Sequence, residues 1–281
     1  MSLFCALASG SSGNCFYLKS GETSLLIDLG ISCRSATQGL GQLGACPQEL
    51  SGILLTHEHS DHIKGLPVFL KKNPVPVYGP AAVLEHLERN VALPAHARLV
   101  PVEGDFMLGQ LAVRPFLTQH DSAASFGYRM TGPDGATVGL ATDLGCYTEP
   151  VHQGLSGCDL VVLESNYDEG MILASSYPYY LKRRIQSPYG HLSNSECAQA
   201  LCRLAQEGTR RFLLCHLSQN NNLPILAHQA SASALEAAGF SPGQAVQLQV
   251  AQRSQLSQPV WLRESPAAQP EGEWKEAAAL C

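Results

Sequence analysis

The stretch THEHSDH at residues 56–62 follows directly after GILL at residues 52–55, a short apolar run that predicts a buried strand. On an extended backbone, His57 and His59 point to the same side because they are two residues apart. Asp61 and the histidine after it then begin a turn or a helix, so their side chains diverge toward a second point. Three imidazoles and a carboxylate this close together can hold two cations side by side. A solvated, histidine-rich loop is the alternative, and the buried strand in front of the segment argues against it.

Further candidates stand at or just beyond the ends of other short apolar runs: Asp28, His120, Asp143 and His216. Rigid scaffolds present functional side chains at such positions, where a strand gives way to a loop. Three of the four are additional candidate ligands, whereas Asp28 can orient a ligating histidine from behind. Any one of them taken alone is equally well a hydrogen-bonded structural residue. Their recurrence at strand ends beside THEHSDH favours a metal site.

Composition and charge exclude several classes of protein. The chain has 281 residues, of which 45% are hydrophobic and 15% are charged, and its net charge is −6. It contains no apolar run of about 18 residues, so no membrane-spanning helix is expected. Its mild acidity argues against a protein that binds nucleic acid by bulk charge. The 10 cysteines are scattered without a CxxC pair and the start of the chain lacks the pattern of a signal peptide, so we expect a cytoplasmic protein.

The chain is predicted to form one mixed α/β domain over residues 1–253. Hairpin-joined strands dominate the first half and helices are interleaved in the second, which favours a sandwich over a strictly alternating parallel sheet. SNSE at residues 193–196 matches a capping box and predicts the start of a helix. Residues 254–281 are polar and rich in proline, so we expect a C-terminal extension that is partly disordered, with Trp261 as an exception.

The order of these motifs resembles the metallo-β-lactamase fold. The resemblance implies a four-layer αββα sandwich, with two divalent metal ions at one edge of its two sheets. It also implies that one ion is bound by His57, His59 and His120, the other by Asp61, His62 and His216, and that Asp143 bridges them. True β-lactamases of this kind commonly have a cysteine where this chain has Asp143, which argues against a lactamase. Nitrogen and oxygen ligands without a thiolate suit zinc, manganese or iron.

Four segments resemble the YycJ/WalJ group of metallo-β-lactamase-fold exonucleases, and ribonuclease Z enzymes are more distantly similar. The segments are ASGSSGN at 8–14, ESN at 164–166, GHLSN at 190–194 and HLSQNN at 216–221. The resemblance implies a 5′-directed DNA exonuclease in which Glu164 orients or charges His191, and His191 protonates the leaving oxygen. The alternative is that His191 simply precedes a helix cap. The group has a histidine close after ESN, where this chain has Tyr167.

Positive charge for binding a substrate is concentrated in Lys182-Arg183-Arg184, a dense basic run. Tyrosines stand on both sides of it, so bases could stack there while the basic side chains meet phosphates. A solvated surface is the alternative. The Ser/Gly loop at residues 9–13 could offer backbone N–H groups to a phosphate, although a tight hairpin turn explains it nearly as well. The remaining candidate substrate contacts are Ser11, Asn14 and Asn194.

Together these features predict a dinuclear metal-dependent phosphodiesterase whose nucleic acid substrate, single- or double-stranded, is DNA in preference to RNA. A metal-bridged hydroxide would attack phosphorus, Asp61 would help to position it, and His191 would act as general acid. A thioester hydrolase of the glyoxalase II kind shares the ligand set but needs neither Glu164, His191 nor the basic run. A ribonuclease of the tRNA-processing type is a further possibility, as is a metal-binding sensor with a decayed site. The oligomeric state stays open.

Overall fold

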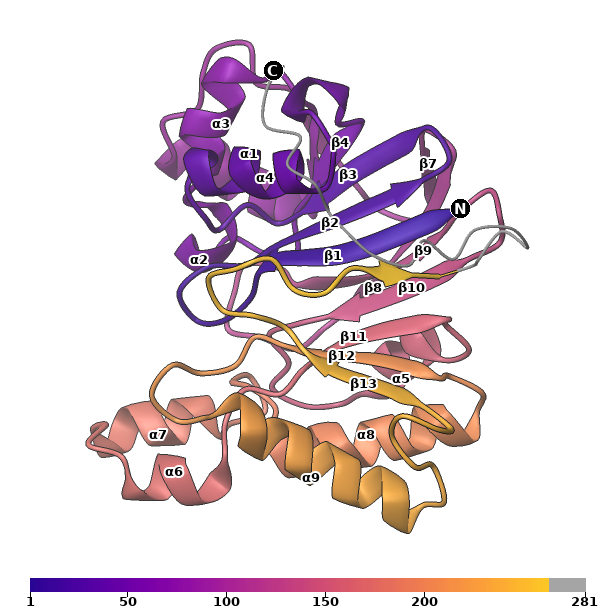
Figure 1. The fold of residues 1–281 in the computed structure, drawn as a ribbon. Coiled ribbons are helices and arrows are strands. Elements are labelled where there is room, and N and C mark those ends of the chain that lie inside the picture. The colour runs from indigo at the N-terminus through magenta and orange to yellow at the C-terminus, as the bar shows by residue number, and fades with distance from the viewer. Residues whose placement is uncertain (263–281) are drawn as a thin grey trace.

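Two seven-stranded β-sheets lie face to face in a computed structural model that describes residues 1–262 (Figure 1). Helices cover the outer side of each sheet, so the layers run helix, sheet, sheet, helix. The predicted four-layer αββα sandwich is therefore confirmed. Within residues 1–262, no helix combines the length and the apolarity that crossing a membrane requires.

The first sheet has the strand order β14-β1-β2-β3-β4-β5-β6. Its strands β1 to β3 pair antiparallel, as the hairpin-joined runs predict, and β3 to β6 pair parallel. The strands are β1 (Ser2–Ala8), β2 (Cys15–Ser20), β3 (Thr23–Ile27), β4 (Gly52–Leu54), β5 (Val77–Gly79), β6 (Leu99–Pro101) and β14 (Val260–Trp261).

The second sheet has the order β13-β12-β11-β10-β9-β8-β7 and repeats this plan. Strands β7 to β10 pair antiparallel, and β10 to β13 pair parallel. The strands are β7 (Phe106–Leu108), β8 (Leu111–Leu117), β9 (Phe126–Thr131), β10 (Thr137–Ala141), β11 (Leu160–Glu164), β12 (Arg211–Cys215) and β13 (Gln247–Val250).

Helices α1, α3 and α4 pack on the first sheet, and α5, α8 and α9 on the second. The predicted capping box is present at the start of α8, where Ser193 and Glu196 exchange hydrogen bonds with each other's backbone. The helices are α1 (Cys33–Gln42), α2 (Ser60–Ile63), α3 (Leu66–Lys72), α4 (Ala81–Asn90), α5 (Glu149–Leu155), α6 (Glu169–Ala174), α7 (Tyr179–Ile185), α8 (Asn194–Gln206) and α9 (Pro224–Ala237), with a 3₁₀ turn at Pro47–Glu49.

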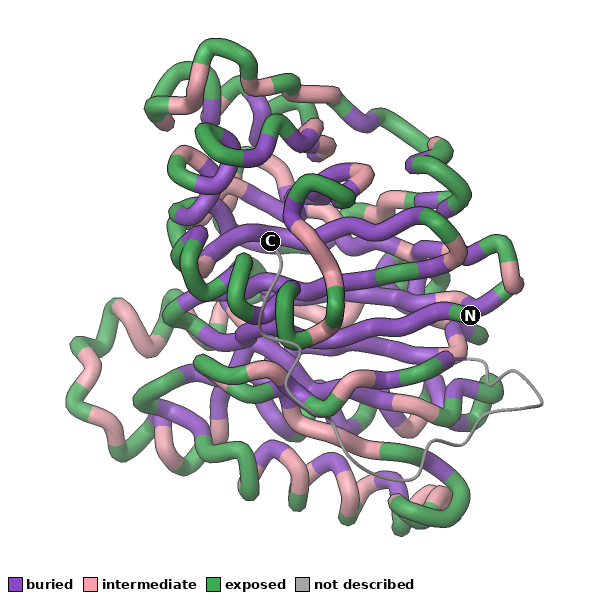
Figure 2. The backbone as a smooth tube through the Cα atoms, turned by 45° about the horizontal axis from the view of Figure 1, so that its top comes forward, coloured by how far each residue is buried: buried purple, intermediate pink, exposed green. Residues whose placement is uncertain are grey.

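Strand alternation divides the apolar side chains among three cores. In β1, Phe4 and Ala6 face the space between the two sheets, whereas Leu3 and Leu7 face the helices of the first sheet. A third core packs α5, α8 and α9 against the second sheet. Both faces of the central strands are therefore buried, as the purple strands of Figure 2 show. Burial on both faces explains why these strands are short, continuous apolar runs in the sequence.

The first part of the expected C-terminal extension joins the first sheet. Strand β14 pairs antiparallel with β1, opposite Leu3 and Phe4. Val260 is buried by this pairing, while Trp261 stays partly exposed. The pairing covers the edge that β1 would otherwise present to solvent. The rest of the extension, residues 263–281, lies outside the described residues.

Candidate metal centre and active site

The predicted metal ligands, together with Asp28, Glu164 and His191, meet at one edge of the sandwich, where the parallel strands of both sheets end. Asp28 and His57 follow β3 and β4 in the first sheet, and Asp143 and His216 follow β10 and β12 in the second. Glu164 is the last residue of β11, which lies between β10 and β12. Because the carboxyl ends of parallel strands lie at the same edge of a sheet, residues far apart in the chain come together there.

Three of these residues, Asp28, Asp143 and His216, have a left-handed backbone, with φ of 58°, 56° and 54°. Among residues 1–262 they are the only residues other than glycine with positive φ. This conformation costs an L-residue on the order of 1–3 kcal/mol and persists where the surroundings hold it. Each of the three stands within two residues of a strand end. Backbone strain in the described part of the chain is thus concentrated at the site.

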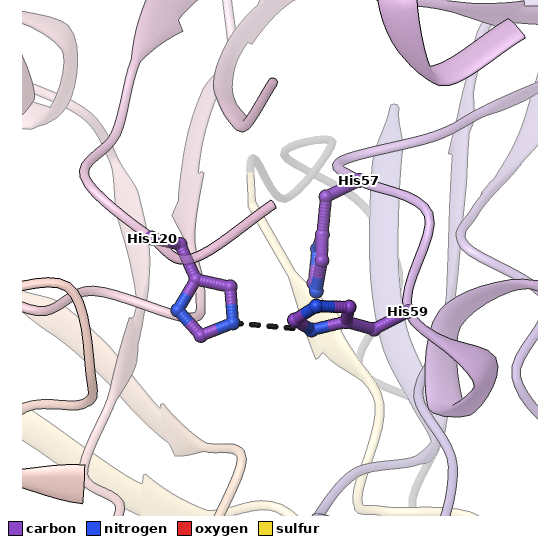
Figure 3. A group of neighbouring side chains, drawn as sticks. All are labelled: His57, His59 and His120. Carbon is purple, nitrogen blue, oxygen red and sulfur yellow. Dashed lines mark hydrogen bonds between the residues drawn. The ribbon is translucent and has the colours of Figure 1, made fainter. Parts of the chain in front are cut away.

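His57, His59 and His120, which we call the histidine cluster, turn their rings toward one another (Figure 3). Nδ1 of His59 lies 3.2 Å from Nε2 of His120. The Nδ1 of His120 donates to the carbonyl of Gly190 at 3.0 Å, which leaves its Nε2 lone pair facing the cluster. Nε2 of His57 is buried and has no hydrogen-bond partner among the described residues. Buried polar atoms normally have partners, so this arrangement points to a cation between the rings.

Asp61, His62 and His216 form a second group, which we call the carboxylate cluster. Nε2 of His216 lies 3.3 Å and Nε2 of His62 3.6 Å from Oδ2 of Asp61. On the opposite side of each ring, Nδ1 of His62 donates to Asp28 and Nδ1 of His216 donates to Glu164, both at 2.8 Å. A carboxylate behind a histidine fixes its tautomer and ring orientation, so the Nε2 of each ring is turned toward Asp61.

Asp143 lies between the two clusters. Its Oδ2 is 3.1 Å from Nε2 of His62, in the carboxylate cluster. Its Oδ1 is 3.6 Å from Nε2 of His120, in the histidine cluster, and 3.5 Å from Nε2 of His216. The hydroxyl of Thr142 donates to Oδ2 at 2.9 Å and helps to hold the carboxylate in place. An aspartate that faces both clusters is placed to be a shared ligand.

Charges within the site oppose the effect of burial on several pKa values. Burial would raise the pKa of the Asp143 carboxyl, but His216 and His62 beside it hold that pKa well below its usual range. Burial would lower the pKa of His62, but Asp143 and Asp28 raise that pKa to about 10. For His57, burial lowers the pKa, and the neighbouring His62 lowers it further. Burial thus favours the neutral imidazole of His57, whereas nearby carboxylates favour the protonated form of His62 in the absence of a metal ion.

The side chains at this edge fit divalent metal ions. The two clusters and Asp143 bring together imidazole nitrogens and carboxylate oxygens in groups whose ligand atoms lie within 4.8 Å of one another. Such a ligand set, without a thiolate, suits zinc, manganese or iron. The unpartnered Nε2 of His57 gives an independent reason to expect a cation. The site can therefore hold metal ions.

His191 and Glu164 form a hydrogen-bonded pair beside the clusters. Nδ1 of His191 donates to Oε1 of Glu164 at 2.8 Å, and Glu164 is fully buried. The second oxygen of Glu164 accepts from the backbone N–H groups of Leu144 and Leu192 at 2.7 and 3.2 Å. Burial would raise the pKa of Glu164, but His191 and His216 hold that pKa below its usual value. The His191 side chain is 17% exposed, so its Nε2 can meet a substrate.

Two of the candidate substrate contacts are buried. Asn14 is fully buried, and its amide nitrogen lies 3.1 Å from Nε2 of His62. Asn194 is also buried, and its amide group is hydrogen-bonded to Ser165 and Asn222. The polar atoms of Asn194 are used within the protein, so we propose no substrate contact for this residue.

The other candidate substrate contacts lie on the surface. Ser11 is exposed, and its hydroxyl accepts from the backbone N–H of Gln219 at 3.3 Å. The basic run Lys182-Arg183-Arg184 lies on α7, a helix without a buried residue. These side chains are accessible to a large ligand.

The sequence interpretation missed two polar residues that hold the ligands. The hydroxyl of Thr56 donates to Asp28 at 2.8 Å and lies 3.0 Å from Nδ1 of His57. The amide of Asn166 donates to the backbone carbonyl of His216 at 2.9 Å. Thr56 directly precedes the histidine motif, and Asn166 ends the ESN segment. Both residues could have been predicted from the sequence, because each is polar and belongs to or directly precedes a motif of the site.

Comparisons with known proteins agree with this geometry. Residues 23–217 match the model of the β-lactamase superfamily domain. The chain is 35% identical over 249 residues to the exodeoxyribonuclease YycJ of Bacillus anthracis, a match that covers 87% of this chain and 93% of that protein. It is 34% identical over 241 residues to the exodeoxyribonuclease WalJ of Streptococcus pneumoniae serotype 2, covering 84% of this chain and 89% of that protein.

A solved structure shares the fold. The metallo-β-lactamase fold protein YhfI from Bacillus subtilis matches with a TM-score of 0.68, over 92% of this chain and 100% of that chain. Its sequence identity is 18%, so this likeness supports the fold alone. The family model and the two relatives go further, because they match most of the chain. The chain therefore belongs to the metallo-β-lactamase superfamily, in the family of the exodeoxyribonucleases YycJ and WalJ.

Proposed function

We propose that this chain is a dinuclear metal-dependent exonuclease that removes nucleotides from the 5′ end of DNA. Two relatives named exodeoxyribonucleases support the reaction class and the substrate. The observation that carries the proposal is the Glu164–His191 pair beside two clusters of ligand atoms. Hydrolysis of a phosphodiester near neutral pH needs a proton for its alkoxide leaving group, whereas a thiolate leaves without one. The pair therefore favours a phosphodiesterase over a thioester hydrolase.

In this proposal the histidine cluster holds one ion, the carboxylate cluster holds the second, and Asp143 is shared. Two divalent ions, when bound, supply Lewis acidity and lower the pKa of a water molecule for in-line displacement at phosphorus. Asp61 is 23% exposed and more accessible than the buried Asp143. It accepts a hydrogen bond from the attacking water and orients that water toward phosphorus.

His191 is the proposed general acid. Its Nδ1–H stays on the buried Glu164, so Nε2 is the atom that gives a proton to the leaving oxygen. The carboxylate of Glu164, whose pKa is held low, accepts that Nδ1–H and holds the His191 ring in place for the transfer. The same Glu164 oxygen also accepts from His216 at 2.8 Å, which fixes the acid relative to a ligand.

Substrate contacts complete the proposal. Ser11 and the basic run on α7 would contact the phosphates of the strand, since they are accessible at the surface. Asn14 would instead act on His62, because it is buried against that ring.

The test is incubation of metal-loaded protein with 5′- and 3′-labelled DNA and RNA, each single- and double-stranded. We expect stepwise loss of nucleotides from the 5′ end of DNA in manganese or zinc, and no loss with the Asp61→Ala variant. Hydrolysis of S-lactoylglutathione without cleavage of any phosphodiester would overturn the proposal. Equal cleavage by Asp61→Ala and the parent protein would show that the residues named here do not perform the reaction.

The role of His191 can be tested separately, by comparing substrates whose leaving groups differ in their need for a proton. We expect His191→Ala to cleave DNA about 10²–10⁴-fold more slowly than the parent protein. A p-nitrophenyl phosphodiester, whose leaving group needs no proton, should be affected far less. An equal loss on both substrates would exclude His191 as the proton donor.

A further inference from the structure

We propose that a cavity beside α1, which we call the α1 cavity, is a binding site for a small phosphate monoester. Its volume is about 710 Å³, and it lies between the β1–β2 loop, α1 and the segment that joins β13 to β14. In Figure 1 this last segment, in yellow, passes beside the indigo loop, and the backbone N–H of Ser9 donates to the carbonyl of Gln252 at 3.0 Å. The proposal goes beyond the proposed nuclease function and does not depend on it.

Two cations, Arg253 and Lys64, line the α1 cavity, whereas no aspartate or glutamate among residues 1–262 does. Nη2 of Arg253 donates to the backbone carbonyl of Ser218 at 3.1 Å, and its Nη1 is buried without a hydrogen-bond partner in the same range. Nζ of Lys64 donates to the carbonyl of Ser12. Both partners are neutral, so neither positive charge is balanced by the described part of the chain. Because a charge is costly to bury without a partner, these cations favour an anion in the cavity.

Both cations lie against the same short loop, residues 9–13. Lys64 contacts Ser12, and a Cβ atom at Gly10 would lie 3.0 Å from Nη1 of Arg253. The loop is closed by a turn, in which the N–H of Gly13 donates to the carbonyl of Gly10 at 2.9 Å. This turn brings the two positive groups near each other, so that one phosphate group can interact with both.

The rest of the lining suits the two parts of a phosphate monoester. Ser32, the N-cap of α1, and Ser35 supply hydroxyl groups, and the first turn of α1 has no acidic residue. The positive end of the helix dipole therefore adds to the attraction for a phosphate. Apolar contacts for the organic part come from Leu7, Ile31 and Leu256. A cavity of about 710 Å³ has the size of small-molecule sites, which is more than a phosphate ion alone would fill.

The α1 cavity is separate from the metal centre although the two are neighbours. The loop between them also holds the ligands, since Oγ of Ser9 accepts from the backbone N–H of His216 at 2.9 Å. Asn14, which follows the loop, lies 3.1 Å from Nε2 of His62. None of the proposed metal ligands lines the cavity. Binding of an anion there can therefore be measured on protein from which metal has been removed.

The test is isothermal titration calorimetry of the chelator-treated full chain with three ligands: inorganic phosphate, deoxythymidine 5′-monophosphate and ribose 5-phosphate. We expect one monoester to bind per chain, and more tightly than inorganic phosphate, because it also uses the apolar contacts. Tighter binding of the nucleotide than of ribose 5-phosphate would identify a nucleotide as the ligand. The reverse order would identify a sugar phosphate.

Three variants locate the site. Arg253→Gln and Lys64→Gln should each weaken binding of the monoester by about tenfold or more, because each removes a charge-assisted hydrogen bond. Arg253→Lys keeps the charge and should retain most of the affinity. Gln38→Trp adds volume at the wall of the cavity without changing its charge, and should weaken binding as well. Thermal unfolding without ligand shows whether each variant is folded.

The matched control is Lys71→Gln, which removes an exposed cation on α3 that does not line the cavity. It should leave the affinity unchanged. Absence of binding by the folded parent protein, unchanged binding by the folded Arg253→Gln and Lys64→Gln variants, or an equal loss with Lys71→Gln would each overturn the proposal. Because no metal is present, these results are independent of whether the protein cleaves DNA. Absence of cleavage by the metal-loaded parent protein would count against the proposed function alone.

Discussion

The histidine cluster and the carboxylate cluster lie side by side but are held by different kinds of partner. In the histidine cluster, Nδ1 of His57 meets the hydroxyl of Thr56 at 3.0 Å, and Nδ1 of His120 meets a backbone carbonyl. These partners are neutral. In the carboxylate cluster, His62 and His216 are each hydrogen-bonded to a fully buried carboxylate at 2.8 Å. The protein thus fixes one set of ligands with dipoles and the other with charge.

Because their partners differ, the two clusters are expected to differ in their affinity for metal ions. A carboxylate behind a histidine increases the basicity of the ligating nitrogen and holds the ring in place. The carboxylate cluster also includes Asp61, whose pKa burial would raise but the neighbouring His216 and His62 hold below its usual value. The histidine cluster has no carboxylate besides the shared Asp143, and so it attracts a cation less strongly. We therefore expect the carboxylate cluster to fill first and the histidine cluster second.

The largest effect is expected from Asp143, which contacts histidines of both clusters. Asp143→Ala should lower nucleotide release to the level of a protein-free control, because neither cluster keeps its shared ligand. Metal content, measured by plasma emission, should fall as well. Asp105→Ala removes an exposed carboxylate paired with Arg114 and should remain fully active. If the two variants were equally active, Asp143 would not be a shared ligand.

A smaller effect is expected from Asp28, which stands behind His62 only. Asp28→Asn keeps the shape of the side chain but removes its charge, so the affinity for metal should fall by about 10–100-fold. The loss should be confined to one of two binding steps in a calorimetric titration with manganese. An equal loss in both steps would show that the clusters are not held independently.

The smallest effect on metal affinity is expected from Thr56. Its hydroxyl is hydrogen-bonded to Asp28, behind the carboxylate cluster, and to His57 of the histidine cluster. Thr56→Val keeps the volume of the side chain and removes its hydrogen bonds to Asp28 and His57. One such bond is worth about 1 kcal/mol, so metal affinity should fall about fivefold. The same titration measures this change. A loss as large as that of Asp28→Asn would mean that charge is not the main difference between the clusters.

The sequence was most informative where short buried strands end in polar residues. The candidate ligands converge because each stands at or near a strand end, and parallel strands bring those ends to one edge. The Glu164–His191 contact joins two predicted residues 27 positions apart in the chain. Spacing alone could not predict the direction of the Asn194 side chain, which turns inward to Ser165 although its motif borders the site.

Other parts of the fold have no sequence pattern from which they could be predicted. Helix α7 has no buried residue, so it has no apolar period and was not predicted as a helix. Strand β14 is two residues long, and its partner β1 is at the opposite end of the chain. Long-range pairing of so short a segment depends on the finished sheet and not on local sequence. Helix α7 and strand β14 were therefore found only in the structure.

The most direct test of the two-cluster account is a titration of chelator-treated protein with manganese while nucleotide release from DNA is followed. We expect no nuclease activity before metal is added, and a rise in activity that ends only when two ions per chain are bound. Nuclease activity in the presence of the chelator, or full activity with one ion per chain, would contradict it.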